Sequence, residues 1–100
     1  MIDATVITLW PEENRGIFAT RATTEGSDVL ATVDSVGLNE YYKAMAEGLE
    51  PEVVFVLADY ADYAGEKLVL WNNVPYTVIR ATRRGMTMRL TCQREAFNNG

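Results

Sequence analysis

Residues 35–55 read S-V-G-L-N-E-Y-Y-K-A-M-A-E-G-L-E-P-E-V-V-F, and the rest of the chain is organised around this stretch. Its middle part predicts a helix over about residues 39–48, with the side chain of Asn39 capping a free backbone N–H of the first turn. Gly48 suits the left-handed conformation that ends many helices, and Pro51 blocks continuation. The sequence on either side is strand-like, so we expect one helix inserted between two strands.

One face of this helix is apolar, because the spacing i, i+4, i+7, i+11 brings Leu38, Tyr42, Met45 and Leu49 together. A helix of two to three turns is too short to persist alone in water. It therefore has to dock, either on the rest of the chain or on a partner. Tyr41 and Tyr42 point about 100° apart on a helix, so one is expected to pack inward. The outward tyrosine is the preferred interface residue.

Short segments rich in β-branched residues predict strands. Asn72 and Asn73 tolerate positive φ and form a hairpin turn, and Arg83, Arg84 and Gly85 form the next turn. The expected fold is mainly β: a small antiparallel β-barrel or sandwich of five to six strands, with one short α-helix in the connection between central strands. The expected strands cover residues 4–9, 28–36, 53–58, 67–71, 76–82 and 87–94, with a weaker signal at 17–24.

The length of 100 residues suits a single domain over residues 1–100, and the composition is that of an ordinary globular protein. Cys92 is the only cysteine, which excludes an intramolecular disulfide. It alternates with polar residues beside Leu90, so a buried structural thiol is favoured over a reactive one. No apolar run approaches the length of a membrane span, so no membrane partner is expected.

The net charge of −5 argues against a general nucleic-acid binder, which needs a basic footprint. The charge is unevenly distributed along the sequence. The segment after residue 79 contains five arginines and one acidic residue, Glu95, while the remainder of the chain has a net charge of −9. Two interpretations stay open: unlike faces that bring identical subunits together head to tail, and a solvated basic hairpin on an acidic domain. The five arginines are Arg80, Arg83, Arg84, Arg89 and Arg94.

No pattern of residues points to catalysis. The absence of histidine excludes Ser/His/Asp and Cys/His nucleophile systems, and no phosphate-binding glycine motif is present. Asp59, Asp62 and Glu66 form the closest carboxylate cluster, but they lack the ligand spacing of a calcium loop, so a solvated loop is favoured. Paired glycosidase carboxylates remain open, although no pair is singled out. We therefore expect no enzyme activity, no cofactor and no metal.

The aromatic residues can serve as a stacking platform for bases or sugars, as a protein interface or as core. Core packing is favoured for Trp71 and Tyr76. Tyr60 and Tyr63 can form a contact patch with the outward tyrosine of the helix. Taken together, the residues favour an assembly module over an enzyme.

Several short motifs follow one another along nearly the whole chain. In order, they are Ile7-Thr8-Leu9, Ser35-Val36, E-Y-Y-K-A at 40–44, Gly48 with Pro51-Glu52, Tyr63 with Gly65-Glu66, Tyr76-x-Val78-x-Arg80, and Leu90 in the last strand. This order resembles the head–tail joining proteins of long-tailed bacteriophages, the head-closure or stopper group. Ala64 departs from the polar or small turn residue frequent in that group. Residues of about 10–26 correspond to a segment that varies among such proteins.

The resemblance implies a structural protein of the virion, made in the host bacterial cytoplasm. Copies would form a ring below the portal and adaptor proteins, close the DNA-filled head, and offer a docking surface to the tail-terminator protein. The genome would pass through or be blocked without sequence-specific binding, and an isolated chain can stay monomeric. The connection at 39–51 would face the channel or the neighbouring subunit. The candidate interface residues are Asn39, Glu40, Tyr41, Tyr42, Glu47, Pro51, Tyr60, Tyr63, Arg83 and Arg84.

Two alternatives remain open. A tail-terminator or minor tail ring subunit has the same β-rich assembly physics as a head-closure protein. A stand-alone β-barrel module that binds oligosaccharide or single-stranded nucleic acid would use the tyrosines instead.

Overall fold

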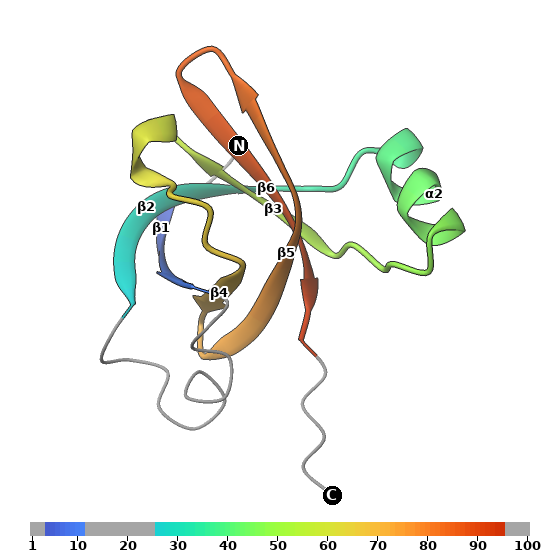
Figure 1. The fold of residues 1–100 in the computed structure, drawn as a ribbon, viewed down its shortest axis with the longest axis horizontal. Coiled ribbons are helices and arrows are strands. Elements are labelled where there is room, and N and C mark those ends of the chain that lie inside the picture. Colours follow the sequence, from blue (N-terminus) through green and yellow to red (C-terminus); the bar gives the residue numbers. More distant parts are fainter. Residues whose placement is uncertain (1–3, 12–25, 96–100) are drawn as a thin grey trace, which may run out of the picture.

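The computed structural model describes residues 4–11 and 26–95, and within them six strands form a closed antiparallel barrel (Figure 1). The barrel and the single α-helix between β2 and β3 confirm the predicted mainly β fold. The expected strand at 17–24 lies outside the described residues. The elements are β1 Ala4–Trp10, β2 Ser27–Asp34, α2 Leu38–Ala46, β3 Val53–Leu57, the 3₁₀ helix η2 Tyr60–Asp62, β4 Leu68–Trp71, β5 Val74–Arg84 and β6 Thr87–Arg94.

The strands follow the order β1-β2-β3-β6-β5-β4 around the barrel. The barrel closes where β1 pairs with β4, with Thr8 opposite Leu70. β5 is much longer than β4 and pairs with it only from Val74 to Thr77, whereas its pairing with β6 extends to Arg84. The register between β5 and β6 shifts at Val78/Arg80, which marks a β-bulge.

The core is the inside of the barrel, where alternate residues of each strand point. An aromatic cluster lies at its centre: the ring of Phe55 is edge-on to Trp71 at 5.4 Å and to Tyr76 at 5.7 Å between centroids. Trp71 Nε1 also donates a hydrogen bond to Thr5 Oγ1 at 3.1 Å. The prediction that Trp71 and Tyr76 pack in the core is therefore confirmed. The buried core residues are Ile7, Leu9, Ala31, Val53, Phe55, Leu57, Val69, Tyr76, Val78, Leu90 and Cys92.

Cys92 is fully buried, as predicted, and burial raises the pKa of its thiol. A thiol reagent should modify the folded protein at least about a thousandfold more slowly than the protein in urea, because reaction requires unfolding that costs roughly 5 kcal/mol. The rate of colour release from a chromogenic disulfide reagent measures this ratio. Similar rates with and without urea would show that the thiol is accessible in the native barrel.

The predicted cap of the helix is wrong. Helix α2 begins at Leu38, with Gly37 as the N-cap and no side-chain capping bond. The N–H of Tyr41 donates to the carbonyl of Gly37 at 2.9 Å, so the first turn closes two residues before the expected cap and Asn39 already lies inside it. Gly48 has the expected positive φ, 82°. No helix of the described residues is long and apolar enough to cross a membrane.

The two hairpins differ in how well they were predicted. Asn72 and Asn73 have φ of 53° and 65°, which confirms the first turn. The second turn is wrong, because β5 continues through Arg84 and the chain reverses at Gly85 and the exposed Met86. Gly85 provides the positive φ of 60° that this reversal needs, so both arginines remain in the strand.

Candidate functional site

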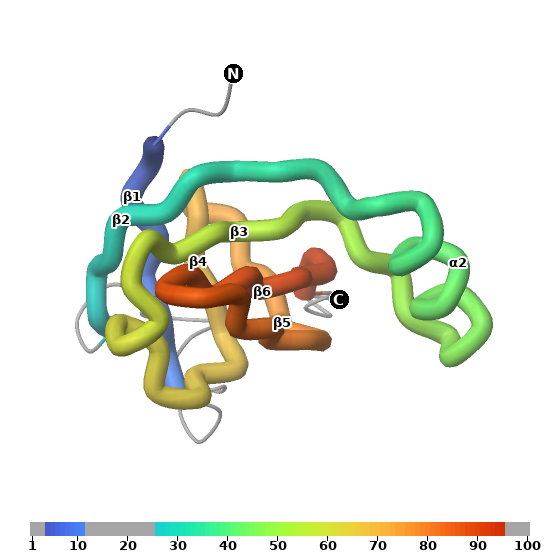
Figure 2. Tube along the Cα trace, turned by 90° about the horizontal axis from the view of Figure 1, so that it is seen from above, coloured from blue at the N-terminus to red at the C-terminus, as the bar shows by residue number. Residues whose placement is uncertain are grey.

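Residues 35–52, here called the arm, leave the barrel between β2 and β3 and carry α2 (Figures 1 and 2). Both views place α2 at one end of the molecule, apart from the strands. None of the helix residues is buried, and Leu38, Tyr42 and Met45 are 67%, 62% and 46% exposed. The helix therefore does not dock its apolar face on its own barrel.

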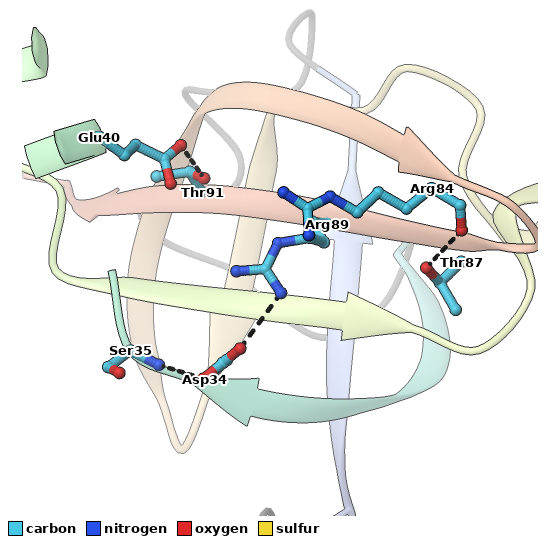
Figure 3. A network of polar contacts seen from close by, with 7 residues as sticks. All are labelled: Asp34, Ser35, Glu40, Arg84, Thr87, Arg89 and Thr91. Atoms are coloured by element: carbon cyan, nitrogen blue, oxygen red, sulfur yellow. Dashed lines mark hydrogen bonds and ion pairs between the residues drawn. The ribbon is translucent and has the colours of Figure 1, made fainter. Parts of the chain in front are cut away.

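The base of the arm is nevertheless tied to β6. Thr91 Oγ1 donates to the Glu40 carboxylate at 2.8 Å (Figure 3). The N–H of Glu50 donates to Gln93 Oε1 at 3.0 Å, and the N–H of Glu52 donates to the carbonyl of Cys92 at 2.9 Å. Pro51 is buried at this junction. These bonds root the arm at both of its ends, so it projects in a defined direction.

The helix turns its polar face, not its apolar face, toward the barrel. Glu40, Lys43, Ala44 and Glu47 line a cavity of about 100 Å³ together with residues of β5 and β6. The placement of Leu49 on the apolar face is wrong, because α2 ends at Ala46 and Leu49 lines this same cavity on the barrel side. The residues on the opposite side of the helix are the exposed Leu38, Tyr41, Tyr42 and Met45. A surface helix usually buries its apolar face, so this orientation is the reverse of the ordinary one.

The expectation that one tyrosine of the helix packs inward is wrong. Tyr41 is 36% exposed and Tyr42 is 62% exposed, and their rings contact each other edge-on with centroids 5.8 Å apart. The physical reason is that both belong to the outward, apolar half of α2. Tyr42 is the more exposed of the two and is the outward tyrosine of the candidate interface.

Basic side chains gather on the outer surface of β5 and β6 beside the arm. Arg80, Arg84 and Arg89, here called the basic face, line a depression of about 200 Å³ with Lys43 and Asn39 of the helix. Arg89 Nη1 lies 3.1 Å from Asp34 Oδ2 (Figure 3). Within the described residues, Arg80 and Arg84 form no ion pair. Glu40 lines the same depression, so its carboxylate and that of Asp34 offset part of this positive charge.

The pKa of Asp34 lies below its usual value, because its carboxylate accepts hydrogen bonds from the N–H of Ser35 and from Arg89. A lowered pKa contributes stability that is complete above the ordinary value of 3.8 and disappears as the pH falls through the lowered value. The side chain is 34% exposed, so the contribution is at most about 1 kcal/mol.

Asp34→Asn should therefore destabilise the protein slightly at pH 7, and by less at a second pH well below 3.8. Urea unfolding of both proteins at the two pH values checks this. High salt at pH 7 serves as the control, because it should reduce the difference by screening. An equal difference at both pH values would assign the effect to packing and not to charge.

In the acidic loop after β3, carboxylates accept hydrogen bonds from backbone N–H groups of the same loop. Asp59 accepts the N–H of Ala61 at 2.9 Å and so caps η2, and Glu66 accepts the N–H of Ala64 at 2.8 Å. The Tyr63 hydroxyl donates to the carbonyl of Glu66 at 2.6 Å, and burial, assisted by the Glu66 charge, raises the pKa of Tyr63 to about 12. Among the described residues, no three His, Cys, Asp or Glu side chains lie in an arrangement that could hold a metal ion.

The structure separates the candidate residues into two groups. Those of the arm lie on or next to α2, whereas Tyr60 and Tyr63 lie in and beside η2, at the other end of the molecule (Figures 1 and 2). Arg83 and Arg84 end β5, and the side chain of Arg84 extends from there to the depression that Asn39 also lines (Figure 3). The guanidinium of Arg83 stacks on Tyr60, 3.5 Å from the ring centroid. The expected patch of Tyr60 and Tyr63 with the outward tyrosine is therefore not formed. The arm group comprises Asn39, Glu40, Tyr41, Tyr42, Glu47 and Pro51.

Sequence reasoning did not include Arg80 and Arg89 among the candidates, although both belong to the basic face. The signal was present for Arg89, because it alternates with the core residues Leu90 and Cys92 and so had to point outward. For Arg80 the signal was hidden, since the bulge before it changes which residues of β5 face out.

Comparison with protein-family models and with curated proteins gives no match for this chain. Its function is therefore inferred from its own residues and their geometry. The surfaces that bear on function are the outward apolar face of the arm and the basic face beside it.

Proposed function

We propose that this chain is a structural subunit of the head–tail connector of a long-tailed bacteriophage. In this proposal, copies form a ring below the portal and adaptor proteins, keep the packaged genome in the head, and offer a surface to the tail. The observation that carries the proposal is the arm, a rooted helix whose apolar residues face away from its own barrel. Such a helix is explained by a protein partner.

The placement of the tyrosines favours this role over a stand-alone ligand-binding barrel. A stacking platform needs several open aromatic rings side by side. Here Tyr76 is buried in the core, Tyr60 is covered by Arg83, and Tyr63 is half-buried with its hydroxyl bonded to Glu66. The pair Tyr41–Tyr42 stands on the arm, at the other end of the molecule. These rings therefore do not form one binding surface.

The acidic balance of the chain also supports the proposal. The net charge of −5 disfavours a firm grip on the phosphate backbone. A conduit for DNA benefits from weak attraction, because the genome has to leave through it during infection. A ring lumen with a strongly positive surface would count against this part of the proposal.

Nuclease protection of the genome in purified DNA-filled heads tests the function. Heads that lack this chain should leak DNA and lose it to nuclease, and addition of the purified chain should restore protected DNA. Serum albumin at the same concentration is the control for non-specific crowding. If protection does not change and the chain does not bind heads, the head-closure role is wrong. Abnormal tail ends in particles without the chain would then indicate a tail-terminator role.

A further inference from the structure

The β5–β6 hairpin extends beyond the end of the barrel and leaves one side of β5 open (Figure 1). The pairing of β5 with β4 ends at Thr77, and the N–H of Val78 then donates to the carbonyl of Lys67 at 2.8 Å. Over residues 80–84, within the described part of the chain, β5 pairs with β6 alone. We call residues 80–84 the open edge.

The backbone of the open edge offers hydrogen-bonding groups to a further strand. In an antiparallel pair, alternate residues turn their N–H and C=O toward the partner strand, and the residues between them turn theirs away. The register is regular from Arg80, opposite Thr91, to Arg84, opposite Thr87, so the bulge lies before the open edge and not within it. Four of its five residues are exposed and Thr82 is partly buried, so the stretch is accessible.

A third strand would stabilise this part of the hairpin. Two strands alone are marginally stable in water, and pairing by main-chain hydrogen bonds gives affinity to an added strand. Arg80 and Ala81 point to opposite faces of β5, and both are exposed, so solvent reaches the open edge from either face. An extended segment can therefore lie along β5 without displacing a side chain of the core.

The open edge is basic. Three of its five residues are arginines, and within the described residues none of the three forms an ion pair. The nearest carboxylates on the arm, Glu40 and Glu47, line a cavity with one of these arginines and also with Lys43. Four cations against two carboxylates leave a positive excess. The arginines of the open edge are Arg80, Arg83 and Arg84.

The arrangement of these arginines matches the alternation of a strand. Arg80 and Arg84 share one face with Thr82, and all three line the same depression. Arg83 points to the other face, where its guanidinium stacks on Tyr60. A strand paired with the open edge would place its own alternate side chains beside the first face. Carboxylates are suited to that position, because a guanidinium donates paired N–H groups to them.

We propose that the open edge binds an extended acidic segment of another protein, which adds a strand to β5 and places carboxylates beside Arg80 and Arg84. Main-chain hydrogen bonds provide the affinity, and the arginines select the acidic sequence. The edge would bind such a segment whether or not the chain belongs to a phage connector.

Two other occupants fit the open edge less well. The open edge of a second copy carries the same three arginines, and like charges on paired strands repel. A nucleic acid brings a continuous row of phosphates, which would have to pass the carboxylates of the arm on a chain with a net charge of −5. A short acidic peptide makes the same contacts with arginine without that repulsion.

Titration of the isotope-labelled chain with short capped peptides, followed by NMR, tests this proposal. A peptide in which glutamate and valine alternate should shift the amide signals of residues 80–84. At saturation it should slow hydrogen exchange of the outward amides there about tenfold or more. A peptide of equal charge with a central proline is the matched control. Because proline lacks an N–H and cannot continue the ladder, this control should bind about tenfold more weakly or worse.

Arg80→Gln combined with Arg84→Gln should weaken binding of the alternating peptide about tenfold or more, since two charge-assisted contacts are lost. Arg94→Gln is the matched control on the chain. It removes an arginine that pairs with Glu52 at the far end of β6, so the affinity should stay within about twofold. Equal loss in both proteins, or no loss in the double variant, would contradict selection by the open edge.

Three further results would overturn the proposal. Equal binding of the proline peptide would show attraction by charge without strand pairing. Slow exchange of every amide of residues 80–84 before any peptide is added would show that the edge is already occupied. Tighter binding of a single-stranded oligonucleotide than of the acidic peptide would assign the edge to nucleic acid. Heads that are protected by a chain without affinity for the peptide would retain the connector role and refute this site alone.

Discussion

Replacing Phe55 with alanine should lower the free energy of unfolding by about 3–5 kcal/mol. Phe55 is fully buried, and its ring contacts both Trp71 and Tyr76 at the centre of the barrel. Alanine removes these contacts and leaves a cavity that a closed barrel cannot easily collapse to fill. A domain of this size has a total stability of only about 5–15 kcal/mol, so much of the variant population will unfold on mild heating. Urea unfolding followed by tryptophan fluorescence measures the effect.

The matched control for this variant is Leu30→Ala, an apolar truncation on the outside of the same barrel. Leu30 is 63% exposed, so its loss should change the stability of the isolated chain by no more than about 0.5 kcal/mol. If Phe55→Ala unfolds at the same urea concentration as Leu30→Ala, the aromatic cluster does not stabilise the barrel as described.

Tyr42→Ala should abolish most assembly on DNA-filled heads and leave folding intact. A tyrosine at the centre of an interface typically contributes about 2 kcal/mol or more to binding, which is roughly a 30-fold loss of affinity on truncation. Tyr42 is 62% exposed in the isolated chain, so its removal should change the unfolding transition very little. The amount of chain that sediments with heads and the fraction of nuclease-protected DNA measure assembly, and thermal unfolding measures folding.

Tyr60→Ala is the informative comparison, because it removes another tyrosine at the opposite end of the molecule. It breaks the stacking of Arg83 on the ring of Tyr60 but leaves the arm unaltered. We expect it to bind heads like the wild type. The opposite pattern, in which Tyr60→Ala fails to assemble and Tyr42→Ala assembles normally, would place the subunit contact near η2.

Most strands of this fold could be predicted because their signal is local. The alternation of Met88, Leu90 and Cys92 with polar residues states directly which side of β6 faces the core. The pairing of β1 with β4, in contrast, joins Thr8 to Leu70 across most of the chain. No local pattern encodes that contact, so barrel and sandwich remained equally compatible with the sequence.

The candidate site was predictable as a segment but not as a surface. The amphipathic spacing of Leu38, Tyr42 and Met45 identifies the helix and its apolar face from the sequence alone. It does not say whether that face meets the barrel, since this depends on how the ends of the arm are rooted. The bonds of Glu40 to Thr91 and of Glu50 to Gln93 fix the orientation, and they join residues more than 40 positions apart.

The overhang of β5 beyond β4 has a consequence for the solubility of the unassembled chain. Within the described residues, the backbone of residues 80–84 has a hydrogen-bonded neighbour on the β6 side only. An open strand edge of this kind is a template for aggregation. Here Arg80, Arg83 and Arg84 occupy it, and the bulge before Arg80 twists it, so a second edge meets like charges and a poor fit. The arginines thus oppose edge-to-edge pairing of chains and fibril growth.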